Sequence, residues 1–416
     1  MTFVTRRTLL AMGAAGTLTA ACGSGGKRDR IRVAIIGGGI VGASIAYHLA
    51  KLDAEVTVLE RDEIATRASR GTFAWLNATW AKQPRHYHKL NQLGLAGWKE
   101  LERDLAIPIK WGGSIEWFGQ AKRQALLENQ IAEQVEWGEP ARMIRGDELQ
   151  SLEPDVDFAS TQSAAFSPND GAVDPVLATR ILLENAESLG AKIRTNRAVT
   201  GVRAGVDGAD TDRSPTSVLQ TVEGDIEVDA FVLATGADTD ATKLLADIEI
   251  PQRSTPGVIV VTRPMKPVLN RILVAPGVHI HQRHDGRIVL GEQEGAPETE
   301  AHALRLAGRP NQFPNRNLAE QHASRILAIA QTYLPEIVAA EVEDVYIGWR
   351  PLPLDGHPVL GFSPTRKNAY LAISHSGVSL APIIGRLVSQ EIIDGISVEA
   401  LAPYRPDRVF EDGNRY

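Results

Sequence analysis

The chain has only one cysteine, Cys22, in 416 residues. It therefore cannot form an internal disulfide, and it cannot hold a cysteine-ligated metal or an iron–sulfur cluster. Any tightly bound redox group must be held by other chemistry.

Long apolar runs and clusters of positive charge are lacking as well. After residue 30 we find no stretch long and apolar enough to cross a bilayer. The net charge is −7 and no Lys/Arg run occurs in this part, so binding to nucleic acid or to an anionic membrane is not expected. With 43% hydrophobic and 23% charged residues, the composition is that of a globular protein, and the length suggests two or three domains.

The N-terminal segment 1–30 is predicted to be a signal sequence and a linker. Arg6 and Arg7 precede a short apolar stretch, 9–21, rich in Gly and Ala. This order is typical of a twin-arginine leader, which exports proteins already folded around a cofactor. An N-terminal extension unrelated to export is the alternative.

The end of this segment resembles a bacterial lipoprotein site, where Cys22 would be acylated. Thr19 stands where such sites usually carry leucine, so ordinary cleavage after Ala21 is the alternative. Either route predicts an exported protein, in the periplasm or at the outer face of the cytoplasmic membrane, with a lipid anchor only in the first case.

A dinucleotide-binding pattern follows. Residues 31–36 are mostly β-branched, residues 37–42 contain G-x-G-x-x-G, residues 43–50 have helical character, and a second strand, 55–59, ends at an acid, Glu60. Strand, glycines, helix, strand and acid in this order are far more specific than the glycines alone.

Each part of the pattern has a physical reason. Gly37 allows a tight turn, Gly39 lets the backbone approach a pyrophosphate, and Gly42 lets helix and strand pack closely. The helix N-terminus offers N–H groups to the anion. Glu60 would accept hydrogen bonds from the adenosine ribose, which argues against a 2′-phosphate and hence against NADP.

Further blocks narrow the choice of cofactor. A run of small and polar residues occupies 65–78, and the segment 230–237 contains a buried strand that ends in Thr235-Gly236. G-x-R-P…D-G-x-P…G spans 348–361, and S-H-S-G-V-S-L-A-P spans 374–382, running into a predicted helix over 383–393. Residues 171–175 and 189–193 bracket another helix.

With these blocks, the chain resembles the D-amino acid oxidase/glycine oxidase (DAO) family of FAD-dependent oxidoreductases from residue 31 to about 395. The resemblance implies an α/β fold of the two-domain α+β kind: a Rossmann-like FAD-binding domain plus an antiparallel-sheet substrate domain. We assign 31–80, 150–245 and 345–400 to the first, 81–149 and 246–344 to the second, and 401–416 to a C-terminal tail.

The resemblance also implies which residues hold FAD. The cofactor would be bound without a covalent bond to cysteine, and the N-terminal end of the helix predicted over 383–393 would favour negative charge on the flavin. The implied cofactor-binding residues are Gly37, Gly39, Ile40, Val41, Gly42, Glu60, Arg61, Ser69, Arg70, Gly71, Thr72, Phe73, Ala74, Val199 (through its backbone), Gly236, His375, Ser376, Gly377, Val378, Ser379 and Leu380.

For the substrate, the arginine of G-x-R-P is Arg350, which in family members acting on free amino acids pairs with the substrate carboxylate. The alternative is a structural arginine bonded to local carbonyls. His375 stands where glycine oxidase has a second arginine, which puts glycine itself in doubt. His375 would either gate the site or pack beside the flavin. No catalytic side-chain base is assigned, and no metal site is expected.

The resemblance implies hydride transfer from a carbon alpha to an amine onto flavin N5, giving an imine that water hydrolyses. The substrate would be an amino acid or secondary amine, and the electron acceptor oxygen or another compound. Two alternatives remain: a flavoenzyme of this fold that oxidises a hydroxy acid or polyol, and a flavin-binding or assembly protein without turnover.

Local sequence patterns also predict secondary structure in and near the predicted substrate domain. We expect an amphipathic helix over 84–105, a strand over 111–118, and a helical region over 301–334. Residues 278–283 and 287–290 flank a turn and predict a hairpin, and a polar surface hairpin is expected over 201–224.

Several aromatic and histidine residues allow two readings. His279 and His281 share one face of a predicted strand. They could form a metal-binding pair, but surface or sheet-packing histidines are the preferred interpretation. Core packing is preferred over a cavity wall for Trp75, Trp80, Trp111 and Trp117. His86 and His88 precede the long helix and are expected to face solvent.

Overall fold

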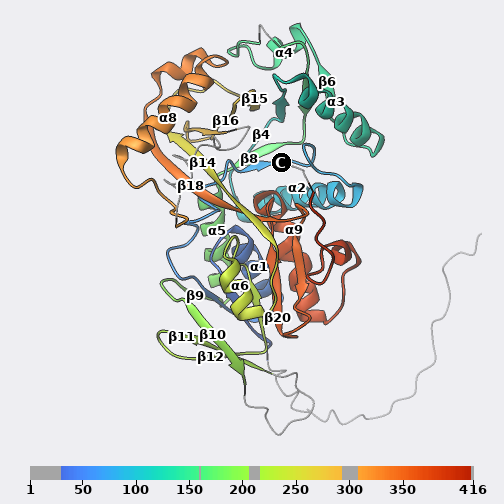
Figure 1. Ribbon diagram of the computed structural model, residues 1–416, viewed down its shortest axis with the longest axis vertical. Coiled ribbons are helices and arrows are strands. Elements are labelled where there is room, and N and C mark those ends of the chain that lie inside the picture. Colours follow the sequence, from blue (N-terminus) through green and yellow to red (C-terminus); the bar gives the residue numbers. More distant parts are fainter. Residues whose placement is uncertain (1–29, 159–160, 206–215, 293–307, 414–416) are drawn as a thin grey trace, which may run out of the picture. The chain divides into compact units, whose positions relative to one another are not determined.

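The computed structural model describes residues 30–158, 161–205, 216–292 and 308–413 (Figure 1). Arg6, Arg7, Cys22 and the rest of the predicted signal sequence lie outside the described residues, as does part of the expected helical region 301–334. The chain from Ile31 onward is one compact unit.

The described helices and strands are as follows. The helices are α1 Ile40–Lys51, α2 Arg85–Leu105, α3 Ala121–Glu136, α4 Asp147–Leu152, α5 Pro175–Ser188, α6 Thr239–Ala246, α8 Arg316–Gln331 and α9 Gly377–Asp394, with 3₁₀ turns η1 Pro335–Ala339 and η2 Glu399–Tyr404. The strands are β1 Arg32–Ile36, β2 Glu55–Leu59, β3 Trp75–Leu76, β4 Ile109–Trp111, β5 Ser114–Glu116, β6 Arg142–Ile144, β7 Ala164–Ser167, β8 Gly171–Val173, β9 Lys192–Arg194, β10 Val199–Ala204, β11 Ser217–Thr221, β12 Ile226–Val228, β13 Ala230–Leu233, β14 Gln252–Thr262, β15 Ile272–Ala275, β16 Val278–Gln282, β17 Ile288–Gly291, β18 Val342–Pro353, β19 Val359–Phe362 and β20 Ala369–Ile373.

A six-stranded sheet in the order β19-β20-β13-β1-β2-β9 carries the predicted dinucleotide motif. All neighbouring strands are parallel except β19 and β20. Alternate residues of β1 point to opposite faces: Val33 and Ile35 join the core under α1, α5 and α9, whereas Ala34 and Ile36 join the core with α6. A strand covered on both faces has to be apolar throughout, which is the pattern of 31–36.

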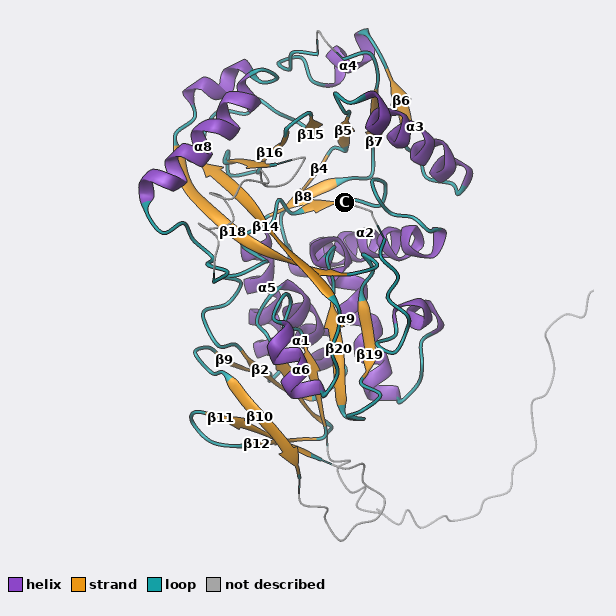
Figure 2. Cartoon of the chain, viewed as in Figure 1, coloured by secondary structure: helices purple, strands orange, loops and turns teal. Residues whose placement is uncertain are grey.

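An eight-stranded sheet in the order β18-β14-β17-β16-β15-β5-β7-β6 forms the other main layer. One of its faces packs against α8, η1 and α4 through residues such as Leu273, Ile280 and Leu290. The long paired strands β14 and β18 run side by side from this sheet towards the parallel sheet (Figure 2). The predicted hairpin is confirmed as β16 and β17, which pair antiparallel.

The predicted domain ranges can be compared with these sheets. The three ranges assigned to the FAD domain supply all six strands of the parallel sheet. The same ranges also supply β7 and most of β18 to the eight-stranded sheet. The division into two domains stays a prediction.

The strand expected over 111–118 is wrong as a single element. The chain instead forms β4 and β5, which belong to different sheets. Gly112 and Gly113 separate them with φ values of +156° and +90°. This backbone turn redirects the chain from the three-stranded sheet β3-β8-β4 into the larger one.

Other elements differ mainly in their ends. α2 and α8 fall within the helices expected over 84–105 and 301–334, and β10 and β11 form the antiparallel pair expected for the polar segment 201–224.

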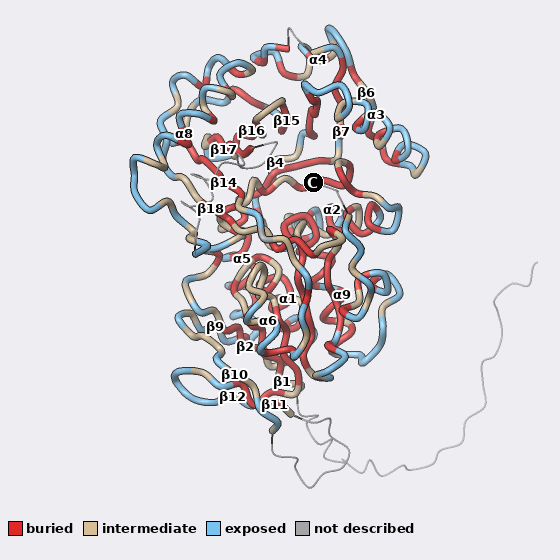
Figure 3. The backbone as a smooth tube through the Cα atoms, in the orientation of Figure 1, coloured by how far each residue is buried: buried red, intermediate tan, exposed pale blue. Residues whose placement is uncertain are grey.

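The burial of α1, of α9 and of much of the two sheets is visible in Figure 3. Within the described residues, no helix is both long and apolar enough to cross a membrane.

Candidate active site

A cavity of about 610 Å³ is lined by both sheets. On the side of the parallel sheet its wall comes from the β1–α1 turn, the end of β2, and residues 234–238 after β13. Opposite, it is lined by Glu116, Ile259, His279 and Gly291 of the larger sheet. The N-terminal end of α9 and the segment 65–77 complete it.

The β1–α1 turn is shaped for a pyrophosphate. Gly37 has φ +119°, and a Cβ there would stand 2.4 Å from the carbonyl oxygen of Ala234. A Cβ on Gly42 would stand 2.1 Å from the carbonyl oxygen of Gly37. Gly39, the N-cap residue of α1, has no side chain to cap the helix, and Ile40 and Val41 of the first turn line the cavity. Uncapped N–H groups at a helix N-terminus attract anions, so this end fits a dinucleotide.

Glu60 and Arg61 lie where β2 ends, and both line the cavity. One Glu60 carboxyl oxygen accepts a hydrogen bond from the Gly38 N–H at 2.7 Å, and the other from the Asp62 N–H at 2.9 Å. Arg61 pairs with Asp238, which follows β13. The acid is thus fixed beside the glycine turn, as a ribose-binding residue must be.

The segment after β2 is held against both sheets. The Ile40 N–H donates to Ser69 Oγ at 2.9 Å, which ties the segment to α1. Gly71 and Gly348 meet backbone to backbone: a Cβ on Gly348 would stand 2.2 Å from the Gly71 carbonyl oxygen. The glycine of G-x-R-P is therefore needed so that β18 can approach this segment.

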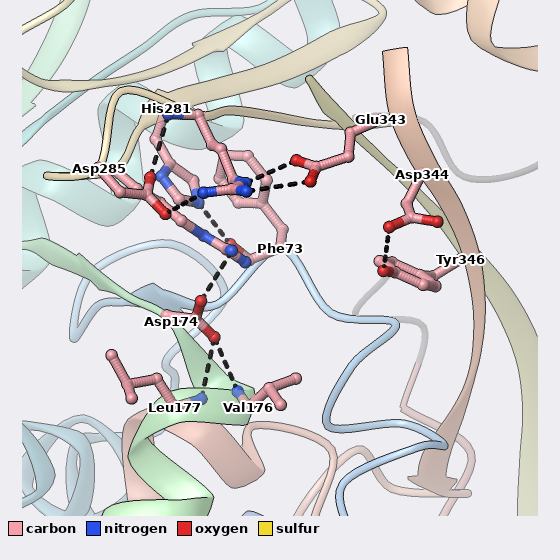
Figure 4. A network of polar contacts seen from close by, with 11 residues as sticks. Phe73, Asp174, Val176, Leu177, His281, Asp285, Glu343, Asp344 and Tyr346 are labelled. Atoms are coloured by element: carbon pink, nitrogen blue, oxygen red, sulfur yellow. Dashed lines mark hydrogen bonds and ion pairs between the residues drawn. The ribbon is translucent and has the colours of Figure 1, made fainter. Parts of the chain in front are cut away.

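Phe73 is fixed by the larger sheet. His281 Nε2 lies 3.0 Å from the Phe73 carbonyl oxygen, to which it donates, and the two rings are in edge contact (Figure 4). Burial lowers the pKa of His281 to about 3, so its imidazole is neutral. Close by, Asp174 caps α5 at the N–H groups of Val176 and Leu177 and pairs with Arg283.

The N-terminal end of α9 is tied to the cavity wall. Ser376 Oγ accepts from Lys82 Nζ at 2.8 Å and from the Tyr87 hydroxyl at 3.0 Å. Ser379 Oγ donates to the Trp75 carbonyl oxygen at 3.0 Å. Lys82 is only 4% exposed, so it adds a positive charge to the positive end of the helix dipole. This end of the cavity favours an anionic group.

Contrary to the sequence prediction, α9 begins at Gly377 rather than at 383. Pro382 lies inside the helix and lacks the N–H that would bond the Val378 carbonyl. The Nε1–H of Trp98 donates to that carbonyl at 2.8 Å instead. A tertiary contact thus replaces the lost helical bond, and residues 377–380 are helical.

Arg350 lies on β18, opposite Thr255 of β14, and lines the cavity. Its guanidinium lies across Gly257, where a Cβ would stand 3.0 Å from Nη2. Its positive charge, together with burial as the larger cause, lowers the pKa of His375 to about 3. His375 lines the same cavity and is neutral, so it does not compete with Arg350 for an anion.

The comparisons with known proteins agree with this geometry. Residues 32–391 match the DAO family, described as FAD dependent oxidoreductase. The chain belongs to this family. It is 25% identical to a glycine oxidase of Bacillus licheniformis over 92% of the chain and 98% of that protein. It is 26% identical to a 4-methylaminobutanoate oxidase (formaldehyde-forming) of Paenarthrobacter nicotinovorans, over 88% of the chain and 44% of that protein.

Among solved structures, glycine oxidase from Geobacillus kaustophilus superposes with a TM-score of 0.76 at 25% identity, covering 92% of this chain and 100% of that one. The predicted mixed α/β fold, with parallel and antiparallel sheets, is confirmed. So are the FAD cofactor and the enzyme class, an FAD-dependent oxidoreductase acting on CH–NH or CH–NH₂ groups.

Most predicted cofactor residues lie together, although their roles stay predictions. Five of them are not among the residues that line the cavity: Gly37, Gly42, Arg70, Val199 and Leu380. Gly37 and Gly42 act through the turn geometry. The Arg70 guanidinium lies over the Tyr346 ring, Val199 begins β10, and Leu380 is buried in the core.

Some aromatic and histidine predictions need correction. His88 is buried, not solvent-facing: its Nδ1 lies 2.7 Å from the Ala78 carbonyl oxygen. His86 is exposed, as expected. Trp75 and Trp80 pack against hydrophobic clusters, as preferred, and they also line the cavity. Trp111 and Trp117 do pack in hydrophobic cores.

His279 and His281 are sheet-packing residues that contact Phe73. His279 also lines the cavity, and burial as the larger cause lowers its pKa to about 3. Within the part of the chain that the structure describes, no group of three or more His, Cys, Asp or Glu residues could hold a metal ion.

Sequence reasoning missed Lys82, Glu116, Asp238 and Gly257, which all line the cavity. Asp238 comes shortly after the strand predicted over this part of the chain, so its place at the cavity could have been predicted from the local sequence. Lys82 comes soon after the recognised block 65–78, but nothing in the local pattern marked it. Glu116 and Gly257 are far along the chain from the recognised blocks, and strand pairing brings them to the cavity.

Proposed function

We propose that the protein oxidises the C–N bond of an amino acid or a secondary amine that carries a carboxylate. The observation that carries this proposal is the position of Arg350. Its guanidinium lines the same cavity as the dinucleotide turn, two residues beyond the Gly348–Gly71 contact. A planar guanidinium pairs with a carboxylate through two parallel hydrogen bonds, which fixes orientation as well as position.

FAD, when bound, supplies the acceptor for a hydride from the substrate carbon. The chain itself orients the substrate and controls charge. Arg350 would hold the carboxylate so that the C–H bond faces the cofactor, and such positioning is a large part of rate enhancement. His279 and His375 are neutral because burial lowers the pKa of both to about 3. An amine entering beside Arg350 and Lys82 is favoured in its uncharged form, which is the form that can lose a hydride.

The test is anaerobic mixing of the purified flavoprotein with a panel of amino acids, N-methyl amino acids, hydroxy acids and polyols. Bleaching of the flavin band by amino acids or N-methyl amines is the expected result. Bleaching only by hydroxy acids or polyols would favour an alcohol-oxidising enzyme of the same fold. Absence of bleaching by every compound would favour a binding or assembly protein. Reoxidation by oxygen, compared with an artificial acceptor, then separates oxidase from dehydrogenase.

We also propose that the enzyme is exported through the twin-arginine machinery after it has bound FAD. The support is the order of Arg6, Arg7, the apolar stretch and Cys22 ahead of a cofactor-binding domain. Replacing both arginines by lysine should leave the protein in the cytoplasm, with its flavin. Replacing Cys22 by serine should release it from the membrane fraction if Cys22 is acylated, and change nothing if cleavage follows Ala21.

A further inference from the structure

Glu116 is a buried carboxyl in the wall of the cavity. Its side chain is only 3% exposed, and it lines the cavity together with Trp80 and Phe118. Among the described residues its Oε1 has no hydrogen-bond partner. Leaving a carboxyl oxygen buried and unsatisfied costs free energy, so such a group in a cavity wall points to a ligand.

The sheet register places Glu116 on the cavity side. Glu116 of β5 is opposite Val274 of β15, and Val274 is opposite His279 of β16. Residues opposite each other on neighbouring strands share a face, so Glu116 and His279 belong to one row. The row continues to Gly291 of β17, where a Cβ would stand 3.5 Å from the Phe73 ring. Glu116 thus lies on the wall that faces the segment beside the cofactor.

Asp170, the acid whose charge acts on Glu116, already has hydrogen-bond partners. Its Oδ2 accepts from Ser114 Oγ at 2.7 Å and from Trp75 Nε1 at 2.8 Å. Burial and the charge of Asp170 both raise the pKa of Glu116, whereas Arg123 lowers it by a smaller amount. Arg123 itself lies over the Phe118 ring, 5.0 Å from its centroid. Glu116 is therefore the carboxyl of this cluster that remains available to a ligand.

Two aromatic rings line the same cavity as this carboxyl. Trp80 and Phe118 have ring centroids 4.8 Å apart, and both line the cavity. A buried carboxyl in a cavity that also has an aromatic ring in its wall is suited to an ammonium or a guanidinium, which gains from the ionic hydrogen bond and from the ring. Arg123 lies over the Phe118 ring, so Trp80 is the ring that would face such a group. Arg350, on the far edge strand β18, supplies the complementary site for a carboxylate.

We propose that Glu116, with Trp80, forms a subsite for a cationic side-chain group of the substrate. This inference rests on the proposed function, since it specifies the substrate as a basic amino acid or N-alkyl amino acid. Arg350 would hold the carboxylate and Glu116 the terminal ammonium or guanidinium. Glu116 is then a specificity-determining residue and takes no part in the oxidation step.

The test compares ornithine with norleucine, which has a methyl group where ornithine has the terminal ammonium. Both enantiomers of each are assayed with the holoenzyme. The unmodified protein should show a higher kcat/KM for ornithine. E116Q should reduce kcat/KM for ornithine by about tenfold or more, because one partner of a buried charged pair is lost. The value for norleucine should change little.

E148Q is the matched control. Glu148 lies on α4, has a side chain that is 42% exposed, and pairs with Arg142. Its replacement also removes one negative charge, but away from the cavity, so it should leave both substrates unaffected. E116L provides a second test: an apolar side chain should shift the preference to norleucine. Equal losses for ornithine and norleucine in E116Q would overturn the proposal, because that result indicates a purely structural role.

Two further measurements keep the outcomes apart. The ornithine preference of the unmodified protein should increase as the pH rises through the raised pKa of Glu116. Asp170, Arg123, Lys82 and His279 also face this region, so E116Q must abolish the pH trend. If no amine is oxidised, the proposed function fails. The subsite is then tested by titrating ornithine and norleucine into the holoprotein and following the flavin spectrum; tighter binding of norleucine would overturn the subsite.

Discussion

The indole Nε1 of Trp98 on α2 donates a hydrogen bond to the carbonyl oxygen of Val378 on α9 at 2.8 Å. Pro382 leaves that carbonyl without its helical N–H partner. Trp98 is fully buried, and the N-terminal end of α9 lines the cavity. One side chain of α2 therefore stabilises the end of the helix that would face the flavin.

Replacing Trp98 by Phe should show this directly. The change keeps most of the apolar contact but leaves the Val378 carbonyl unsatisfied, which costs about 1–3 kcal/mol of stability. FAD should also bind more weakly, because the first turn of α9 loses its anchor. Chemical unfolding and FAD titration of the apoprotein measure the two effects. W137F, at the end of α3, serves as the control and should change neither.

Arg350 should determine affinity for the substrate carboxylate. R350A is expected to lower kcat/KM for carboxylated substrates by about thirtyfold or more, and R350K should recover only part, since lysine cannot form two parallel bonds. Steady-state kinetics with an amino acid and its decarboxylated amine measure the effect. The exposed Arg316, paired with Glu320, offers the control R316A. An unchanged kcat/KM in R350A would assign Arg350 to a structural role.

The free energy of unfolding should decrease as the pH falls, because buried histidines stay neutral in the folded protein. Burial lowers the pKa of His48 to about 4 and of His281 to about 3, from 6.5. Below pH 6.5 the unfolded chain takes up these protons and the folded chain does not. The stability is therefore complete above pH 6.5 and decreases as the pH falls towards 4 and then 3.

H281Q tests the contribution of His281 to this trend. Glutamine can still donate to the Phe73 carbonyl oxygen but does not titrate. Melting temperatures measured between pH 7 and pH 5 should fall less steeply for H281Q than for the unmodified protein. H284Q is the control, since His284 lies in the exposed turn of the same hairpin. Identical slopes for H281Q and the unmodified protein would contradict the assignment.

Arg405 should be important for stability rather than for activity. It forms two hydrogen bonds, 2.8 and 2.5 Å long, to the carboxylate of Glu391, which is 2% exposed. The Tyr370 hydroxyl also donates to this carboxylate. R405A leaves a buried charge without its partner and should lower the free energy of unfolding by about 3–5 kcal/mol.

The control for this change is R386A. Arg386 and Glu100 form a pair in which both side chains are about half exposed, and such pairs contribute at most about 1 kcal/mol. Adding E391Q to R405A should restore part of the stability, because the buried charge is then removed. Equal losses for R405A and R386A would show that the Glu391 pair is no stronger than a surface pair.

The local sequence pattern was sufficient to predict an element wherever the residues that determine its structure are neighbours in the sequence. The strand 31–36, the glycine turn and Glu60 are contiguous, so the cofactor end of the cavity could be predicted. Prediction was wrong where a distant partner decides the outcome. His88 looked like a solvent-facing residue near the start of a helix, but Ala78 and Glu139 enclose it. Residues 377–380 looked like a loop before Pro382, but Trp98 allows them to be helical.

The sequence by itself therefore determined the dinucleotide site, because glycine spacing and strand ends are local properties. Its further blocks resemble those of the DAO family, and that resemblance implied FAD and the class of reaction. Only the tertiary structure decided which polar groups share the substrate cavity. Glu116 and Arg350 are 234 positions apart in the numbering, and sheet pairing places both in its lining. The charge state of a carboxyl depends on its burial and neighbours, which no stretch of sequence specifies alone.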